Sequence, residues 1–419
     1  MRIAVIGGGI SGMGAAYLLA PYASVTLYES DPALGGHANT AFISYDGSEI
    51  AVDTGFMVYN PSRYPYFVAL MKTLGIESVE TSMSFSVSIP DAIEYSSVLS
   101  GLVHDLSQLM RPDYRRMLYD IVRFNRAAKR YLRDPNADKS LLLDDFLSRN
   151  TFSKQFSEWY LFPMMGSIWS AAPETIQSYG AYDSFRFLDN HLLLNIFNRP
   201  EWRTVKGGSR AYVSALQKTI AKEGVLIETG TPVLSISRND SSAVVRTKRG
   251  EQVFECVIMA THADTALTLL QDAVLDERNA RGAFSFSQTT TVLHSDSSFM
   301  PRSKRVWSSW NFHATKSTNA VSLTYCMNNL QHIPETYPVF VTLNPIRPIK
   351  ESAVYSTYSY THPLMNAQAH EGQRALKALQ GKNRTYYAGA HLGYGFREDG
   401  FVSAVDVVNA LGYPIRLSV

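Results

Sequence analysis

A glycine-rich hexapeptide at residues 7–12, Gly-Gly-Gly-Ile-Ser-Gly, constrains the fold of this chain more than any other feature of its sequence. It follows a short apolar run at residues 2–6 and opens a stretch at residues 11–19 that is rich in Ala, Leu and Gly. A second apolar run, residues 24–29, comes next. Strand, glycine turn, helix and strand in this order predict a βαβ unit, and therefore a parallel sheet.

The hexapeptide also satisfies the G-x-G-x-x-G pattern of dinucleotide-binding turns. Gly7 permits the tight turn, Gly9 lets the backbone approach a pyrophosphate, and Gly12 lets the helix pack closely on the strand. The N–H groups at the helix N-terminus attract phosphate. Glu29, at the end of the second strand, is placed to accept hydrogen bonds from a ribose. We therefore expect dinucleotide contacts from Gly7, Gly8, Gly9, Ser11, Gly12, Glu29 and Ser30.

NAD and FAD both bind to this turn pattern, and two further glycine-containing segments indicate which of the two dinucleotides is bound. Leu34-Gly35-Gly36-His37 closely follows Glu29, the acid expected to bind the ribose, and Val52-Asp53-Thr54-Gly55-Phe56 comes shortly after it. This combination resembles the flavin fold shared by amine oxidases, phytoene desaturases and protoporphyrinogen oxidases. The resemblance implies FAD, with donors that stabilise charge on the reduced ring. It implies cofactor contacts from Gly35, Gly36 and His37, and an isoalloxazine ring beside Thr54, Gly55, Phe56 and Met57.

Two later segments are similar to parts of the same superfamily. Pro232-Val233 resembles the strand whose backbone holds adenine. A Gly-rich segment from Gly389 resembles the C-terminal flavin motif, although an ordinary helix cap is the alternative interpretation. The resemblance implies that Glu398 or Asp399 contacts the ribityl chain and that the N–H groups of Gly400-Phe401 face the pyrimidine carbonyl. Because this segment contains no cysteine, we expect a non-covalent FAD.

Six longer stretches narrow the resemblance further: residues 34–39, 52–60, 190–193, 202–210, 321–328 and 339–345. They are similar to one branch of the superfamily, the predicted NAD/FAD-binding, amine-oxidase-like proteins often encoded near cyclopropane-fatty-acid synthases. The resemblance covers essentially the whole chain. It implies a lipid-linked setting and favours unsaturated or methylated fatty acyl chains as substrates.

The chain has 419 residues, more than a single hydrophobic core usually serves. β-type and helical patterns alternate along it, so we predict an α/β fold with α+β elements. A Rossmann-type FAD-binding domain is expected from residues 1–80, 200–285 and 380–419. An interleaved substrate domain, with a mixed sheet plus a helical cap, is expected from residues 81–199 and 286–379.

Several polar and aromatic residues in the second domain are candidates for contact with a substrate. His191 has a side chain whose ordinary pKa suits a general base, and Tyr325 is a second catalytic candidate. Trp169, Trp310 and Asn311 are candidates for contact with the substrate, and Trp169 and the pair Trp307 and Trp310 are candidates for lining an apolar tunnel. For these aromatic residues and for His191, an ordinary place in the core is the competing interpretation. No spacing of ligands indicates a metal site.

Residues 111–133 combine eight Arg and Lys residues with interleaved apolar ones. Such a segment predicts either peripheral contact with an anionic membrane surface or the solvated face of a helix. The net charge of +2 is too small to indicate nucleic acid as a partner. Cys256 and Cys326 form neither a disulfide framework nor a zinc spacing, so a cytoplasmic location is expected. No pattern fixes the oligomeric state.

We therefore expect an FAD-dependent oxidoreductase that acts on a small hydrophobic molecule, a lipid, and desaturates or otherwise modifies an acyl chain by hydride transfer to the flavin N5. Three alternatives remain open at this point. They are amine oxidation, double-bond isomerisation of fatty acids, and non-catalytic lipid carriage of the GDP-dissociation-inhibitor type.

Overall fold

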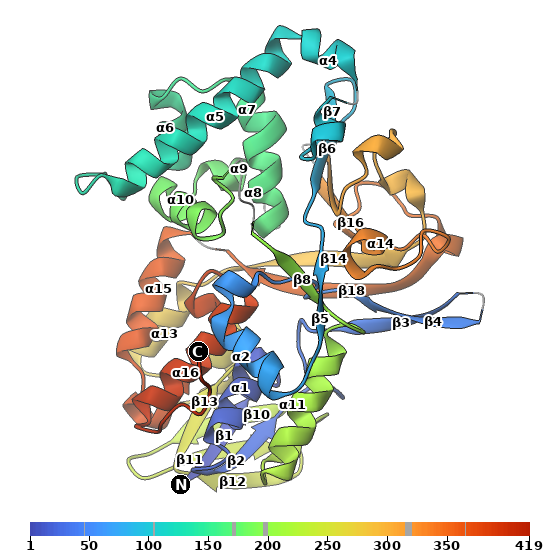
Figure 1. The fold of residues 1–419 in the computed structure, drawn as a ribbon. Helices are drawn as coiled ribbons and strands as arrows, with labels where there is room; N and C mark the ends of the chain where they lie inside the picture. The colour runs from blue at the N-terminus through green and yellow to red at the C-terminus, as the bar shows by residue number, and fades with distance from the viewer. Residues whose placement is uncertain (46, 104, 170–172, 196–199, 315–320, 365) are drawn as a thin grey trace.

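The computed structural model describes residues 1–419 apart from 46, 104, 170–172, 196–199, 315–320 and 365. In Figure 1 a lower region contains a parallel sheet and both chain termini, and an upper region is made of helices. A long mixed sheet lies between these regions and to one side of the helices.

The lower region is organised by a five-stranded sheet in which every neighbouring pair is parallel. Along its central strand, Ile3 and Val5 belong to one apolar cluster, while Ala4 and Ile6 belong to another. A strand that is apolar on both sides must be covered on both faces, as in α/β proteins. The sheet order is β19 (Thr385–Tyr387), β13 (Cys256–Met259), β1 (Arg2–Ile6), β2 (Ser24–Tyr28) and β9 (Leu226–Glu228).

Two layers cover this sheet. The first consists of α1 (Ile10–Leu19), α2 (Pro65–Thr73), α11 (Arg210–Lys222) and α16 (Arg397–Ala410). The second consists of β10 (Val233–Arg238), β11 (Ala243–Thr247), β12 (Gly250–Phe254), α12 (Ala263–Leu269), α13 (Leu275–Gly282) and α15 (Ala367–Ala378). All ten residues of α1 are buried, because this helix is enclosed between the sheet and α16.

A seven-stranded sheet joins segments that are far apart in the sequence. It is mixed, since β15 and β6 are parallel whereas the other neighbouring pairs are antiparallel. Its order is β18 (Val354–Pro363), β14 (Phe286–His294), β17 (Phe340–Leu343), β16 (Val321–Cys326), β15 (Trp310–Ala314), β6 (Phe85–Ile89) and β7 (Ile93–Ser96). The remaining elements near it are the pairs β3 (Thr40–Tyr45) with β4 (Ser48–Asp53) and β5 (Ser78–Thr81) with β8 (Trp202–Val205), and α14 (Met327–Gln331).

The helical region has its own aromatic core. Phe124 contacts Phe146, Phe156 and Phe185, with ring centroids between 5.1 and 6.5 Å apart. No helix of the described residues is both long enough and apolar enough to cross a bilayer. The helices are α3 (Leu99–Leu102), α4 (Leu106–Met110), α5 (Pro112–Arg133), α6 (Leu143–Arg149), α7 (Lys154–Phe156), α8 (Phe162–Trp169), α9 (Pro173–Gln177) and α10 (Ala181–Asn190).

The predicted fold class is confirmed: a Rossmann-type unit, a mixed sheet and a helical cap are all present. Two details differ from the sequence-based expectation. Helix α15 falls within the segment 286–379 assigned to the substrate domain, yet it packs on α13 beside the parallel sheet. Helix α16 begins at Arg397 rather than near Phe401, because the Asp399 carboxylate accepts the N–H groups of Tyr394 and Phe396 and holds the preceding turn.

Candidate functional site

The glycine turn between β1 and α1 has the geometry that a phosphate site requires. Gly7 has φ +111°, and its N–H donates to the Tyr28 carbonyl at 2.8 Å. A Cβ on Gly12 would lie 1.8 Å from the Gly7 carbonyl oxygen, so only glycine allows the helix to approach this closely. At Gly9, which precedes α1 without a side-chain cap, a Cβ would meet no atom within 4 Å.

A second glycine turn faces the first. The Gly35 N–H donates to the Gly8 carbonyl at 2.9 Å, and the nearest atom to a Cβ on Gly36 would be the Gly9 Cα at 3.4 Å. The backbone of Gly9 and Gly36 therefore lies beside the N-terminus of α1, which has no side-chain cap. These residues fit the diphosphate of a dinucleotide.

Glu29 lies at the rim of this cradle. Its carboxylate accepts the Gly8 N–H at 2.6 Å, the Ser30 hydroxyl at 3.0 Å and the Asp31 N–H at 2.9 Å. The Thr231 N–H donates to the Glu29 carbonyl, which places the start of the Val233 strand against the ribose acid. The predicted ribose and adenine residues are thus neighbours in space.

The C-terminal motif is built differently from the prediction in one respect. Because α16 begins at Arg397, the Gly400 N–H donates within the helix to the Phe396 carbonyl at 3.1 Å, and Phe401 is buried in the core. The expectation that the N–H groups of Gly400 and Phe401 face the pyrimidine is therefore wrong for Gly400. The first-turn N–H groups at residues 397–399 are the ones that a helix leaves free of intrahelical bonds.

The two acids of this motif already hold backbone amides. Glu398 accepts the N–H groups of Tyr66 and Phe67, at 2.9 and 3.0 Å, and so caps α2. Burial raises the pKa of Glu398 to about 7 and that of Asp399 to about 6. Contact of either acid with a ribityl chain stays a prediction. Gly389 lies on the neighbouring turn, where its N–H donates to the Ser403 hydroxyl at 2.8 Å.

The segment predicted to pass the isoalloxazine ring links the two halves of the molecule. The Thr54 hydroxyl contacts the Tyr360 hydroxyl on β18. A Cβ on Gly55 would lie 2.2 Å from the His37 carbonyl oxygen, so only glycine fits at position 55. The Phe56 ring packs against the Arg397 guanidinium at 4.4 Å. Met57 is buried against the mixed sheet.

A cluster of four buried or half-buried histidines lies beside this segment, and the sequence analysis missed it as a group. The His37 ring centroid is 5.5 Å from that of His362 and 6.1 Å from that of His262. His391 is buried near His262. Burial lowers the pKa of His37 and of His391 to about 3, and also lowers the pKa of His262 and His362, so the imidazoles are neutral at pH 7.

Hydrogen bonds tie three of these histidines to the mixed sheet. His37 Nε2 lies 3.1 Å from the Thr361 carbonyl oxygen, and the Thr361 hydroxyl lies 3.2 Å from His262 Nδ1. The Thr289 hydroxyl lies 3.4 Å from His362 Nδ1. One signal for this cluster was present in the sequence: His262 and His391 follow β13 and β19 closely, and carboxyl ends of parallel strands share one edge of a sheet.

Asp53 is a second important residue that sequence reasoning passed over. Its side chain is fully buried and accepts the Thr40 hydroxyl, the Ser209 N–H and hydroxyl, and the Gln331 amide, at 2.6 to 3.1 Å. Burial raises the pKa of this carboxyl to about 6. Asp53 therefore fixes the loop that leads into the Thr54–Met57 segment.

The catalytic and substrate candidates fall into two groups. His191 ends α10, with Nδ1 3.0 Å from the Phe187 carbonyl and its ring 5.2 Å from Phe396 of the C-terminal motif. Trp169 packs on the same Phe187 ring at 4.7 Å. Burial lowers the pKa of His191. This group thus packs the helical region against Phe396, directly before α16.

The second group lies on the mixed sheet. Trp310 and Tyr325 are paired on β15 and β16, with ring centroids 5.2 Å apart, and they pack with Met57 in one cluster. Burial raises the pKa of Tyr325. Among the residues that the structure describes, the indole N–H groups of Trp169 and Trp310 are buried and lack hydrogen-bond partners.

Asn311 does not belong to a substrate surface. It is fully buried, and its amide oxygen accepts the Ser86 hydroxyl at 2.7 Å and the Ser308 N–H at 2.9 Å. Its amide nitrogen donates to the carbonyls of Ser308 and Thr324. Because every hydrogen-bonding position of the amide is used within the sheet, the predicted substrate contact is wrong.

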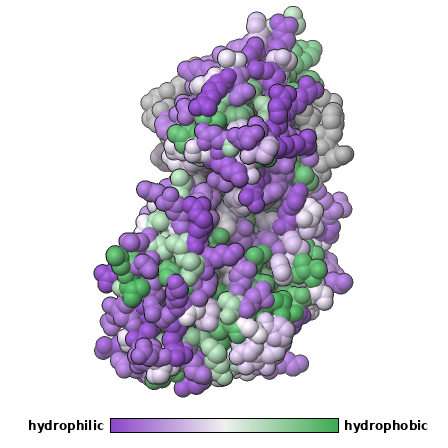
Figure 2. Space-filling view, turned by 90° about the vertical axis from the view of Figure 1, so that its left-hand side faces the viewer, coloured by the Kyte–Doolittle hydropathy of each residue, from purple (hydrophilic) through white to green (hydrophobic). Residues whose placement is uncertain are grey.

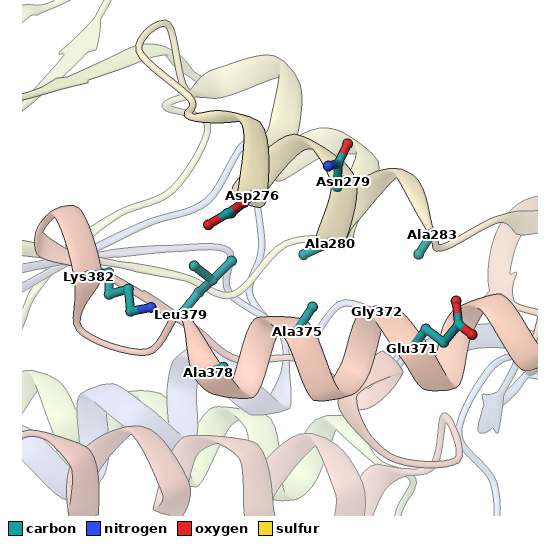
Figure 3. A pocket seen from close by; sticks show the side chains of 10 residues that line it. All are labelled: Asp276, Asn279, Ala280, Ala283, Glu371, Gly372, Ala375, Ala378, Leu379 and Lys382. Atoms are coloured by element: carbon teal, nitrogen blue, oxygen red, sulfur yellow. The ribbon is translucent and has the colours of Figure 1, made fainter.

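A groove of about 400 Å³ lies on another part of the lower region, between α13 and α15 (Figure 3). Small residues face each other across it, Ala280 and Ala283 on one side and Gly372 and Ala375 on the other, and Asp276 and Lys382 lie at one end. None of the predicted site residues lines it. Within the described part of the chain, no group of three His, Cys, Asp or Glu residues is arranged to hold a metal ion.

Comparisons with known proteins give a consistent result. The family model of the flavin-containing amine oxidoreductases matches residues 10–411. No curated protein matches the sequence. Solved structures that share the fold include a putative protoporphyrinogen oxidase from Exiguobacterium sp. 255-15, with 16% identity, TM-score 0.69 and coverage of 98% of this chain and 99% of that one.

Two other structures show the same fold over comparable lengths. A CLA-producing fatty acid isomerase from P. acnes has 16% identity and TM-score 0.71, and the match covers 97% of this chain and 98% of that one. Cyclohexylamine oxidase from Brevibacterium oxydans IH-35A has 14% identity and TM-score 0.71, with coverage of 98% and 99%.

Proposed function

Because this chain belongs to the flavin-containing amine oxidoreductase family and is an FAD-dependent oxidoreductase, we propose that its substrate is a long hydrophobic molecule, a fatty acyl chain, which it desaturates or otherwise modifies. The observation that carries this proposal is the chemistry of the groups beside the Thr54–Met57 segment. Part of this surface is apolar, since Met57, Trp310 and Tyr325 pack in one cluster on the mixed sheet. Transfer of an acyl chain from water to such a surface lowers its free energy.

The polar groups near this segment favour a neutral or anionic substrate over a protonated amine. They are imidazoles, the Arg397 guanidinium, and the Asn39 amide with the Thr54 and Tyr360 hydroxyls, which hydrogen-bond one another. The neighbouring carboxylates of Asp53, Glu398 and Asp399 already accept hydrogen bonds from the protein. A cationic amine would need an uncommitted carboxylate or an aromatic cage to offset its desolvation.

FAD, when bound, supplies the acceptor for a hydride at N5. The chain's own residues position the substrate, exclude water and hold protons. His37 Nε2 faces a carbonyl, which only accepts, so Nε2 carries the proton and Nδ1 has the free lone pair. By the same argument His191 donates from Nδ1 to Phe187, and Nε2 is its basic atom. His191 is thus suited to accept a proton at the border of the helical region.

Double-bond isomerisation is the second candidate, and one comparison favours it. A solved structure with this fold is described as a fatty acid isomerase, so the fold accommodates fatty acids in at least that protein. An isomerase would use the same apolar surface and the same neutral imidazoles but would cause no net oxidation.

The test is anaerobic mixing of the purified holoenzyme with saturated fatty acids, unsaturated fatty acids and primary amines. Bleaching of the flavin absorbance by an acyl substrate, with a product two hydrogens lighter by mass spectrometry, is the expected result. A product of unchanged mass would favour isomerisation. Bleaching by amines alone, with hydrogen peroxide formed on readmission of oxygen, would overturn the acyl proposal.

A further inference from the structure

The exposed face of α5 carries positive charge and no free carboxylate. Seven Arg and Lys residues lie in this helix. At about 100° per residue they fall within an arc of roughly 140°, so they form one stripe on a helix about 33 Å long. The exposed members of the stripe are Arg115, Arg116, Arg126, Arg130 and Arg133.

Both acids of α5 are already paired with arginines. Asp120 is fully buried and pairs with Arg116 and Arg123 at 3.0 and 2.6 Å. Asp113 pairs with Arg111 at 2.6 Å. The cations further along the stripe are therefore opposed by no carboxylate on their own helix face.

The charge is concentrated here rather than spread over the protein. Residues 111–133 contain eight basic and two acidic residues, a net charge of +6, whereas the whole chain has +2. The rest of the molecule therefore carries −4. Such an asymmetry orients a protein toward an anionic surface.

Large apolar side chains are exposed at the same end of the molecule. Leu106 and Met110, one turn apart on α4, have 72% and 75% of their surface exposed. Tyr119, on the cationic stripe, is 59% exposed and lies beside the guanidinium groups of Arg116 and Arg123. Figure 1 shows α4 at the top of the helical region, far from the parallel sheet. Figure 2 shows hydrophilic side chains predominating on one flank of that region, with hydrophobic ones among them.

We propose that α4 and the exposed face of α5 dock this protein on the surface of an anionic lipid bilayer. The arginines would contact lipid phosphates, while Leu106 and Met110 enter the headgroup region. A cationic stripe alone would also fit nucleic acid, but two adjacent exposed aliphatic side chains favour lipid. The proposal concerns the outer surface only, so it does not depend on which substrate the enzyme uses.

The test is flotation of the holoenzyme with phosphatidylcholine vesicles that contain or lack phosphatidylglycerol. We expect binding only to the anionic vesicles, and release at high salt. Replacing Arg115, Arg126 and Arg130 together by Gln should weaken binding about a hundred-fold, at roughly five-fold per cation. The same three positions changed to Lys should retain binding. Leu106→Ser with Met110→Ser should weaken binding without changing its dependence on salt.

Matched controls lie on the small sheet of the lower region, where Leu234 and Val253 are each 49% exposed and Arg246 is also exposed. Leu234→Ser with Val253→Ser, and Arg246→Gln, should leave vesicle binding unchanged. Flavin content and circular dichroism show that each variant is folded. Binding that is indifferent to phosphatidylglycerol, or unaffected by the α4 and α5 variants, overturns the proposal. So does tighter binding to duplex DNA or RNA than to vesicles.

Discussion

The hydroxyl of Thr54 lies 2.7 Å from the phenol oxygen of Tyr360, although 306 residues separate them in the sequence. The Asn39 amide donates to both oxygens, at 2.8 and 3.2 Å. Thr54 belongs to the segment expected beside the flavin ring, and Tyr360 belongs to β18 of the mixed sheet. This polar contact therefore fixes the strand that carries Thr361 and His362 relative to the Thr54–Met57 segment.

A double-mutant cycle with Thr54→Val and Tyr360→Phe measures this contact. Both changes nearly keep the shape of the side chain and remove one hydroxyl. We expect a coupling of about 1 kcal/mol in the free energy of unfolding, because a buried hydrogen bond contributes about that much. Flavin content should be unchanged. Strictly additive effects would show that the two hydroxyls do not interact in solution.

Asn311→Ala tests the conclusion that this residue is structural. The change leaves the Ser86 hydroxyl, the Ser308 N–H and two carbonyls without partners, and each buried unpaired group costs about 1–3 kcal/mol. We expect a loss of about 4 kcal/mol or more in urea denaturation, with flavin reduction by substrate unchanged in the fraction that remains folded.

Ser86→Ala, which removes only one of those contacts, is the matched control and should cost about 1 kcal/mol. If Asn311→Ala instead raised KM and left the free energy of unfolding unchanged, the amide would have to reach the substrate after all.

The parts of the site that sequence could predict are local. Gly7, Gly9, Gly12 and Glu29 lie within one βαβ unit, and their spacing alone dictates the turn and the rim acid. The histidine cluster could not be read in this way, because His37 and His362 meet only when β18 crosses the Gly35–His37 turn. Their proximity is a property of the tertiary fold.

Asn311 and α16 show a different limit. In the sequence, an asparagine within a strand pattern is equally compatible with a substrate contact and with a buried link between strands. Only the hydrogen-bond partners of Asn311 in the fold distinguish these two roles. The start of α16 depends on Asp399, which reaches back to the amides of Tyr394 and Phe396. Because a Gly-rich turn precedes the helix, hydrophobic periodicity in the sequence does not indicate this capping contact.

The buried histidines predict a loss of stability in acid. The pKa of His37 and of His391 is about 3 in the fold, against 6.5 ordinarily, so the unfolded chain takes up protons first. Their stabilising contribution is complete above pH 6.5 and falls as the pH drops toward 3, by up to about 1.4 kcal/mol per pH unit for each histidine. The carboxyls of Asp53, Glu398 and Asp399, whose pKa values burial raises, oppose this slope over the same range. The histidine slope should therefore appear between about pH 4 and pH 7 as the difference between the denaturation curves of the wild type and of a variant that lacks the two imidazoles.

His37→Gln with His391→Gln should flatten that slope, because glutamine keeps polar contacts but does not titrate. Burial lowers the pKa of His37 most, and the neighbouring His362, Arg397 and His262 lower it further; these neighbours remain in the variant. His332→Gln, at an exposed position, is the control and should leave the slope as in the wild type. An equally steep fall in the double variant would place the acid sensitivity elsewhere.

Gly9 and Gly12 offer the sharpest test of the cofactor site, because they differ in what a side chain would meet. Gly9 has φ −75°, and its Cβ would project into open space, so Gly9→Val should change apoprotein stability by no more than about 0.5 kcal/mol while expelling the FAD diphosphate. Gly12→Ala would place a methyl group 1.8 Å from the Gly7 carbonyl oxygen, at a cost of about 1–3 kcal/mol or more.

The Gly9→Val variant should emerge from gel filtration colourless with a melting temperature close to that of wild-type apoprotein, whereas the Gly12→Ala variant should melt at a lower temperature. Gly9→Val protein that is as yellow as the wild type would mean that the diphosphate binds at some other place than the β1–α1 turn.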